Sequence, residues 1–242
     1  MKKNIILLTT ALLSLVLSTS ALAQDTFTEA TEMWNDLLGK YVNAEGLVSY
    51  REMLPDENLS VCIRLFEQVE FDDKWTDHKK LAYLVNVYNI NTVKVVVDNG
   101  CTKGLKEINN AWDIKFITIN GTMYSLNEIE NTLIRPNIEE PRVHFILNCA
   151  AKSCPILLNK AYTEENMEMY LSKSAYAFIN NPEMNTITKD KVEVSKIFEW
   201  YESDFRKSGG VINFINQYSS VKIESGTKLK FKEYDWSLNK LR

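Results

Sequence analysis

Helical and strand-like hydrophobic patterns follow one another along this chain of 242 residues without a regular strand–helix–strand alternation. A regular alternation would predict a doubly wound parallel sheet, whereas an irregular mixture favours the α+β class. We therefore predict a single α+β domain over residues 24–242, in which helices pack a mixed, mostly antiparallel sheet. The 45% share of hydrophobic residues is enough to form a continuous core in a chain of this length.

Apolar spacing, capping residues and turn residues define the predicted elements. Helices are predicted over 27–42, 58–70, 77–98, 164–180, 196–206 and 211–218, with another that opens at the capping box Ser125–Glu128 and ends before Pro136. Strands are predicted over 46–50, 143–147 and 228–232, in a hairpin that pairs 115–119 with 122–125 across Asn120-Gly121, and in a second hairpin over 185–195 that turns at Asp190.

The first 23 residues have the pattern of a secretory leader. Lys2 and Lys3 form a basic start, the run from Ile5 to Leu17 is nearly all apolar, and Ala21-Leu22-Ala23 is the small-residue pattern that precedes a cleavage point. The apolar run is shorter than the about 20 residues that a membrane-spanning helix needs. We expect the leader to be removed and the rest to act in the periplasm or outside the cell, with no membrane span.

Charge and cysteine count narrow the function classes. The formal net charge is −4, so the basic face typical of nucleic-acid-binding proteins is not expected. An exported protein meets an oxidising compartment, and an even count of four cysteines permits complete pairing into disulfides.

Five stretches carry a combined pattern that is more specific than any one of them. They are Ala82–Asn89 (AYLVNVYN), Ser125–Glu130 (SLNEIE), Arg142–Pro155 (RVHFILNCAAKSCP), Trp200–Phe205 (WYESDF) and Tyr234–Asn239 (YDWSLN). Together they resemble the family catalogued as domain of unknown function 547, from about residue 33 to residue 239. The chain departs from the family pattern at Ser49, where Asp is usual, at Leu84, where Trp is common, and at Asn131, where a His often follows the Glu. The resemblance implies an exported or plant-type protein without an assigned reaction, so the chemistry has to be predicted from the residues.

The polar loop Asn148–Pro155 directly follows the predicted strand 143–147 and holds two cysteines. A short loop at the end of a buried strand places reactive groups on a rigid frame. Cys149 is the candidate nucleophile, and His144 is the candidate base. The other histidine, His78, lies in the polar start of a predicted helix.

A catalytic imidazole needs a third group that fixes its tautomer, and Glu130 and Asn148 are the candidates for that role. The backbone N–H groups of residues 150–154 are the candidate oxyanion donors. This arrangement predicts a thiol-dependent hydrolase or acyl transferase of the papain or transglutaminase type, which acts on a peptide or amide and needs no cofactor.

Two other interpretations of the same loop stay open. Cys149 and Cys154 could form a structural disulfide in a non-catalytic envelope or ligand-binding domain. Strict alternation along a strand would also put His144 and Cys149 on opposite faces, which opposes a direct contact between them. A zinc site of the form His144-x4-Cys149-x4-Cys154 lacks an apparent fourth ligand, so no metal is predicted.

Buried polar residues elsewhere have either an anchoring or a binding role. Asn86 and Asn89 share one face of the helix 77–98, where they either fasten a neighbouring loop or contact a ligand. We expect Arg135, Asp204 and Asp235 to be buried pairs or loop anchors first and ligand contacts second, and Cys154 is a further candidate for binding. The ligand would be a peptide or a small molecule of unknown identity.

Overall fold

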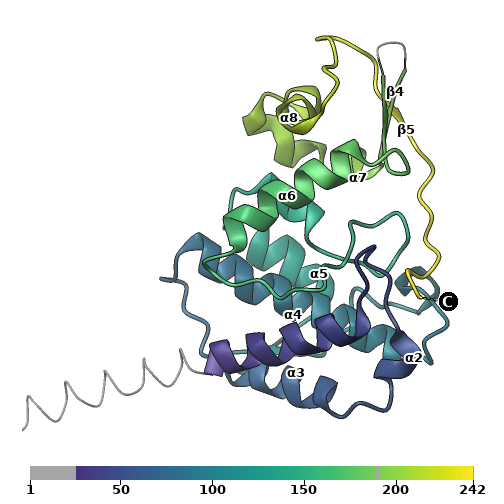
Figure 1. The fold of residues 1–242 in the computed structure, drawn as a ribbon. Coiled ribbons are helices and arrows are strands. Elements are labelled where there is room, and N and C mark those ends of the chain that lie inside the picture. The colour runs from purple at the N-terminus through teal and green to yellow at the C-terminus, as the bar shows by residue number, and fades with distance from the viewer. Residues whose placement is uncertain (1–25, 189–190, 242) are drawn as a thin grey trace, which may run out of the picture.

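A computed structural model describes residues 26–188 and 191–241 of the chain (Figure 1). The helices are 26–41, α2 (Tyr50–Met53), α3 (Asn58–Gln68), α4 (Asp77–Asp98), α5 (Leu126–Glu128), α6 (Met167–Asn180), α7 (Ile197–Trp200) and α8 (Val211–Tyr218). Tighter or wider turns form the 3-10 helices η1 (Leu105–Glu107), η3 (Pro141–Phe145) and η4 (Glu202–Ser208) and the π-helix η2 (Ile129–Ile134). The strands are β1 (Ile117–Ile119), β2 (Thr122–Tyr124), β3 (Thr186–Ile187), β4 (Val192–Val194) and β5 (Lys230–Phe231). The fold is therefore α+β, as predicted.

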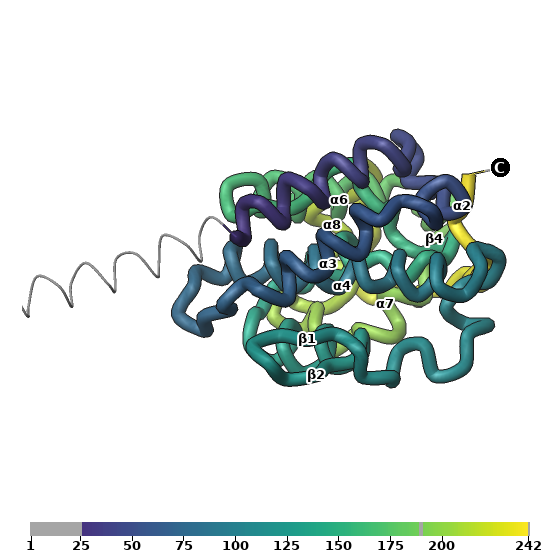
Figure 2. The backbone as a smooth tube through the Cα atoms, turned by 90° about the horizontal axis from the view of Figure 1, so that it is seen from below, coloured from purple at the N-terminus to yellow at the C-terminus, as the bar shows by residue number. Residues whose placement is uncertain are grey.

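The helix α4 forms the centre of the fold. Its start is capped by the Thr76 hydroxyl, which accepts a hydrogen bond from the Lys79 N–H at 3.2 Å, and the chain leaves it through Gly100 at a φ of 80°. It is buried along most of its length and contacts α2, α3, α6 and η2. Seen from below, the helix 26–41 and α3 run side by side next to α4 (Figure 2).

The sheets are small. The antiparallel pair β1–β2 turns at Asn120 and Gly121, both at positive φ, which is the predicted hairpin. The second sheet has the order β3-β4-β5, with β3 antiparallel and β5 parallel to β4. The predicted turn at Asp190 and the predicted leader 1–23 lie outside the described residues.

The predicted strand over 143–147 is wrong. Pro141 opens the 3-10 helix η3 there, and the Glu140 side chain caps it by accepting the Arg142 N–H at 3.0 Å. A short buried apolar run has the same hydrophobicity in either conformation, so its periodicity does not separate strand from helix.

Three other predicted elements have a different structure from the one expected. The predicted strand 46–50 is reduced to isolated bridges of Val48 with Val42 and Lys240, because Tyr50 already begins α2. The predicted helix 196–206 is split into α7 and η4. The helix that Ser125 caps widens into the π-helix η2.

Buried apolar side chains form two clusters in the described chain. The larger, which we call the α4 core, surrounds α4. The smaller, which we call the phenylalanine core, contains Phe145, Phe198, Phe205 and Phe214 and lies among α6, α7 and α8 at the other end of the molecule (Figure 1). Within η3 and its neighbours, Phe145 belongs to the smaller cluster, whereas Val143 and Ile146 belong to the larger. This segment therefore joins the two cores.

The C-terminal segment 232–241 runs from β5 back along the side of the molecule to α2 (Figure 1). Its Leu238 forms a bridge with Ala151, and its Asn239 accepts a hydrogen bond from the Tyr50 hydroxyl at 2.7 Å. No helix among the described residues is both long and apolar enough to cross a membrane.

Candidate functional site

The loop that carries the two candidate thiols is fixed from α4. The buried Asn89 amide donates to Ile146 O at 3.0 Å and accepts from the Asn148 N–H at 2.9 Å. Asn148 in turn donates to Pro155 O at 2.7 Å and accepts from the Ala150 N–H at 2.9 Å, so it closes the loop on itself. These bonds hold Ala150 at a φ of 60°, a left-handed conformation that is uncommon for a residue other than glycine.

One turn earlier on α4, Asn86 fastens a different segment. Its amide donates to Tyr162 O at 2.7 Å and accepts from the Tyr162 N–H at 3.1 Å. Both amides are thus occupied by backbone groups. Of the two roles left open for Asn86 and Asn89, these contacts are those of anchors, and Asn89 holds the thiol loop.

A cavity of about 240 Å³ lies between the two cores. It is lined by Cys149, Cys154, His144 and Glu130, and its aromatic wall includes Tyr201, Tyr234, Trp200 and Trp236. Because residues 141–145 form a 3-10 helix, the strand alternation that would separate His144 from Cys149 does not apply, and both residues reach the same cavity.

The buried His144 ring makes two close contacts, with Tyr201 and Asp204, and has Glu130 at a longer distance. It stacks on Tyr201 with 3.7 Å between ring centroids. Its Nε2 lies 2.8 Å from Asp204 Oδ2, and its Nδ1 lies 3.9 Å from Glu130 Oε1, beyond hydrogen-bond distance. Burial raises the pKa of Tyr201, and the neighbouring Glu130 carboxylate raises it further.

Asp204 is the group that sets the orientation of the imidazole. Burial works to raise the pKa of Asp204, but hydrogen bonds from His144, Arg135 and Ser203 hold that pKa well below its usual range. An ionised carboxylate only accepts hydrogen bonds, so Nε2 of His144 must carry the proton of that bond. In the neutral ring the lone pair is then on Nδ1.

The supporting residues therefore differ from those proposed from the sequence. Asp204 takes the orienting role that was assigned to Glu130 or Asn148, since the Asn148 amide is used within the thiol loop. Arg135, expected first as a member of a buried pair or a loop anchor and second as a ligand contact, forms two hydrogen bonds with Asp204 at 2.6 and 2.8 Å. Arg135 also lies over the Tyr201 ring, 5.0 Å from its centroid.

The pKa values of the two thiols of the loop are shifted in opposite directions. Cys149 is half-buried, and its Sγ lies 3.4 Å from the Tyr234 hydroxyl. A hydrogen bond with the Cys154 thiol lowers the pKa of Cys149 against the effect of burial, and hydrogen bonds from Tyr234 and the Ala151 N–H lower it further. Burial raises the pKa of Cys154 well above its usual value, and its hydrogen bond with Cys149 raises it further.

The predicted oxyanion donors are already occupied. Each backbone N–H of residues 150–154 has an acceptor within the protein. The acceptors are Asn148 Oδ1 for Ala150, the Cys149 sulfur for Ala151, Ser237 O for Lys152, Asp235 O for Ser153 and Ala151 O for Cys154. The Tyr234 hydroxyl lies beside the Cys149 sulfur together with the Ala151 N–H, and the pKa of Tyr234 is raised by burial and by the neighbouring thiols.

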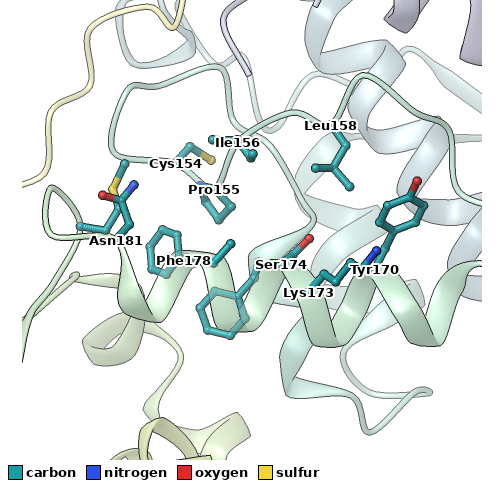
Figure 3. A pocket seen from close by; sticks show the side chains of 12 residues that line it. Cys154, Pro155, Ile156, Leu158, Tyr170, Lys173, Ser174, Phe178 and Asn181 are labelled. Atoms are coloured by element: carbon teal, nitrogen blue, oxygen red, sulfur yellow. The ribbon is translucent and has the colours of Figure 1, made fainter. Parts of the chain in front are cut away.

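A second cavity of about 190 Å³ lies on the other side of Cys154 and Pro155 (Figure 3). Figure 3 shows Ile156 and Leu158, from the segment that follows the thiol loop, on one side and Tyr170 and Phe178 from α6 on the other. This cavity has mostly apolar walls. Cys154 and Pro155 line both cavities, so this part of the loop separates them.

The two alternative interpretations of the thiol loop can be compared with this geometry. All four cysteines lie in the described part of the chain, and all are free thiols in the structure. Among residues 26–188 and 191–241, no group of three His, Cys, Asp or Glu side chains is arranged to hold a metal ion. The zinc site His144–Cys149–Cys154 is not assembled.

Tyr201 and Tyr234 were missed as site residues, and Asp204 was expected as a buried pair or loop anchor but not as the partner of His144. Each stands in a closing motif of the family pattern, Trp200–Phe205 or Tyr234–Asn239, and that position was the available signal. What the sequence lacked was any indication that these motifs meet the thiol loop.

Comparison with known proteins agrees with the resemblance noted from the motifs. Residues 73–179 match the family described as "Protein of unknown function, DUF547". The matched segment contains Glu130, His144, Cys149 and Cys154 but ends before Tyr201, Asp204 and Tyr234. Neither a curated protein nor a solved structure matches the chain.

Proposed function

We propose that this protein is a thiol-dependent hydrolase or acyl transferase acting on an extracytoplasmic peptide or amide, with Cys149 as nucleophile and His144 as acid and base. The observation that carries the proposal is that Cys149 and His144 line one cavity while Asp204 binds the far nitrogen of the imidazole. An imidazole fixed on one nitrogen keeps the other for proton transfer. The leader pattern at residues 1–23 supports the extracytoplasmic part.

In the proposed reaction the Cys149 thiolate attacks the carbonyl carbon of the substrate. The Tyr234 hydroxyl donates a hydrogen bond to the oxygen on which negative charge develops. The amine leaves with the proton that His144 took from Cys149, and an acyl group remains on the sulfur as a thioester. Water then cleaves the thioester in a hydrolase, or a second amine cleaves it in a transferase.

The test is acylation by p-nitrophenyl acetate, an activated ester that needs no specific binding pocket. We expect a burst of about one nitrophenolate per reduced protein and one acetyl group on Cys149 by peptide mass spectrometry. His144→Gln should slow the burst by about 100-fold or more, the usual size of a general acid–base contribution. The matched control is His78→Gln, at the only other histidine of the chain, whose side chain is 43% exposed; this variant should leave the rate unchanged.

An acetyl group found only on lysines, or an equal burst in Cys149→Ser, would remove the enzyme proposal. The alternative is a non-catalytic ligand-binding domain in which the loop 148–155 is structural. The full occupation of the backbone N–H groups of residues 150–154 is the observation that favours it.

A further inference from the structure

The thiols of Cys149 and Cys154 are already in contact. The Cys149 N–H donates to Cys154 Sγ at 2.9 Å, and the two side chains hydrogen-bond each other. The left-handed turn at Ala150 and the Asn148 amide hold this arrangement. Cys154 Sγ therefore lies directly beside the Cys149 backbone, and one short loop carries both thiols.

Access to solvent differs between the two sulfurs. Cys149 is half-buried at the wall of the 240 Å³ cavity, whereas Cys154 is only 5% exposed. A cavity of this size admits a small molecule, so a small disulfide can reach Cys149 first. Disulfide exchange needs one accessible thiol that attacks and a second thiol that resolves the mixed disulfide.

The acid–base properties agree with this division of roles. The thiolate is the attacking form of a cysteine, and the hydrogen bonds at Cys149 favour the thiolate there. Burial disfavours the thiolate of Cys154, so this thiol stays protonated until Cys149 has reacted.

We propose that Cys149 and Cys154 form a reversible dithiol–disulfide couple that exchanges with small aliphatic disulfides, with Cys149 as the attacking thiol and Cys154 as the resolving thiol. The activity goes beyond the proposed acyl transfer and does not require it. While the disulfide is closed, it removes the nucleophile of that reaction.

The exchange balances in two steps. The Cys149 thiolate attacks one sulfur of a disulfide R–S–S–R, so a mixed disulfide Cys149–S–S–R forms and R–S⁻ leaves. Cys154 then passes its proton to the released thiolate and attacks Cys149 Sγ, which expels the second R–S⁻. Two protein thiols are oxidised to one disulfide, and one small disulfide is reduced to two thiols.

The other two cysteines act as internal controls. Cys62 Sγ donates to Ala30 O at 3.4 Å, and Cys101 Sγ donates to Tyr50 O at 3.4 Å. Both are buried, and burial raises the pKa of each. Neither is expected to exchange while the protein is folded.

The experiment equilibrates the reduced, folded mature chain with mixtures of 2-mercaptoethanol and its disulfide, bis(2-hydroxyethyl) disulfide, followed by acid quenching, alkylation and mass spectrometry. We expect two of the four thiols to disappear together in one transition, with Cys149 and Cys154 recovered as one linked species. Cys154→Ser should accumulate a mixed disulfide of 2-mercaptoethanol on Cys149, because the resolving thiol is missing. Cys149→Ser should leave Cys154 reduced, and Cys62→Ala should titrate as the unchanged protein does.

Four thiols that persist in excess bis(2-hydroxyethyl) disulfide would overturn the proposal. So would a 149–154 disulfide that 2-mercaptoethanol reduces only after the protein is unfolded, since that bond would be structural. The titration of the unchanged protein decides this even if a variant does not fold. Because the readout is mass alone, failure of exchange and failure of acyl transfer are observed separately.

Discussion

The two hydrophobic cores supply different parts of the site. The α4 core and its surroundings hold the thiol loop through Asn89 and present Glu130 from η2. The segments around the phenylalanine core supply the partners of the reactive groups, Asp204 from η4 and Tyr234 from the C-terminal segment. The family match covers the first set of residues and ends before the second. In this molecule, the groups that react come from the middle of the chain, and the groups that orient them come from its C-terminal part.

The largest expected effect is the loss of stability caused by a cavity in the phenylalanine core. Phe214 is fully buried in the phenylalanine core, and its ring lies 4.7 Å from that of Phe205 between centroids. We expect Phe214→Ala to lower the free energy of unfolding by about 3–5 kcal/mol through the cavity that it leaves. Because η3 joins the two cores, far- and near-ultraviolet circular dichroism should still report one urea transition.

The matched variant Phe214→Leu keeps most of the volume and should cost less than Phe214→Ala. Two separate transitions in either variant would show that the phenylalanine core unfolds by itself, and the comparison would then describe two independent units.

The next effect concerns the anchors on α4. Asn89→Ala leaves Ile146 O and the Asn148 N–H unpaired, so the free energy of unfolding should fall by about 2–4 kcal/mol. Asn86→Ala leaves the two backbone groups of Tyr162 unpaired and should cost a similar amount. Chemical denaturation measures both values.

The two variants should differ in reactivity. Asn89→Ala releases the thiol loop and should change the rate at which iodoacetamide alkylates Cys149, whereas Asn86→Ala should not. Equal effects on alkylation would mean that the loop responds to general loosening and not to its own anchor.

The third prediction is the pH dependence of the Asp204 interactions. Its pKa is lower in the folded than in the unfolded protein, so its contribution to stability is present above about pH 5 and is lost as the pH falls below about 3.9. Asp204→Asn should therefore cost about 1–3 kcal/mol at pH 7 and progressively less in acid. Urea denaturation at several pH values measures this difference.

Glu193→Gln is the control, since it makes the same kind of change in an exposed ion pair with Lys191. It should have no measurable effect at any pH. A difference between Asp204→Asn and the unchanged protein that stays constant down to pH 3 would contradict the ionised state of Asp204.

The smallest expected effect is a shift in the pH dependence of Cys149 alkylation. With reductant present, the alkylation rate of Cys149 should rise at a lower pH than that of an ordinary cysteine. Tyr234→Phe removes one hydrogen bond to the sulfur and should move that midpoint up by up to about one pH unit. Tyr176→Phe, at an exposed tyrosine of α6, should not move it.

Local signals predicted the frame of the site well. The Thr76 cap, the Asn120-Gly121 turn and the Ser125–Glu128 capping box each depend on groups within a few residues, and all three are present in the structure. The loop 148–155 was likewise placed beside a buried segment, although that segment is a 3-10 helix and not a strand. Glu140 and Pro141 are local signals for the start of η3, and the prediction of a strand did not take them into account.

The sequence by itself determined the α+β class, the position of α4 and the choice of Cys149, His144 and Cys154 as the groups to inspect, because those follow from periodicity and residue type. Only the tertiary structure decided that Asp204 orients His144 across 60 residues of chain and that Tyr234 reaches Cys149 across 85. It also decided that two of the loop N–H groups, those of Lys152 and Ser153, donate to Ser237 O and Asp235 O. Those contacts depend on how the two cores pack and on the path of the C-terminal segment, and no local pattern encodes the distance between residues so far apart.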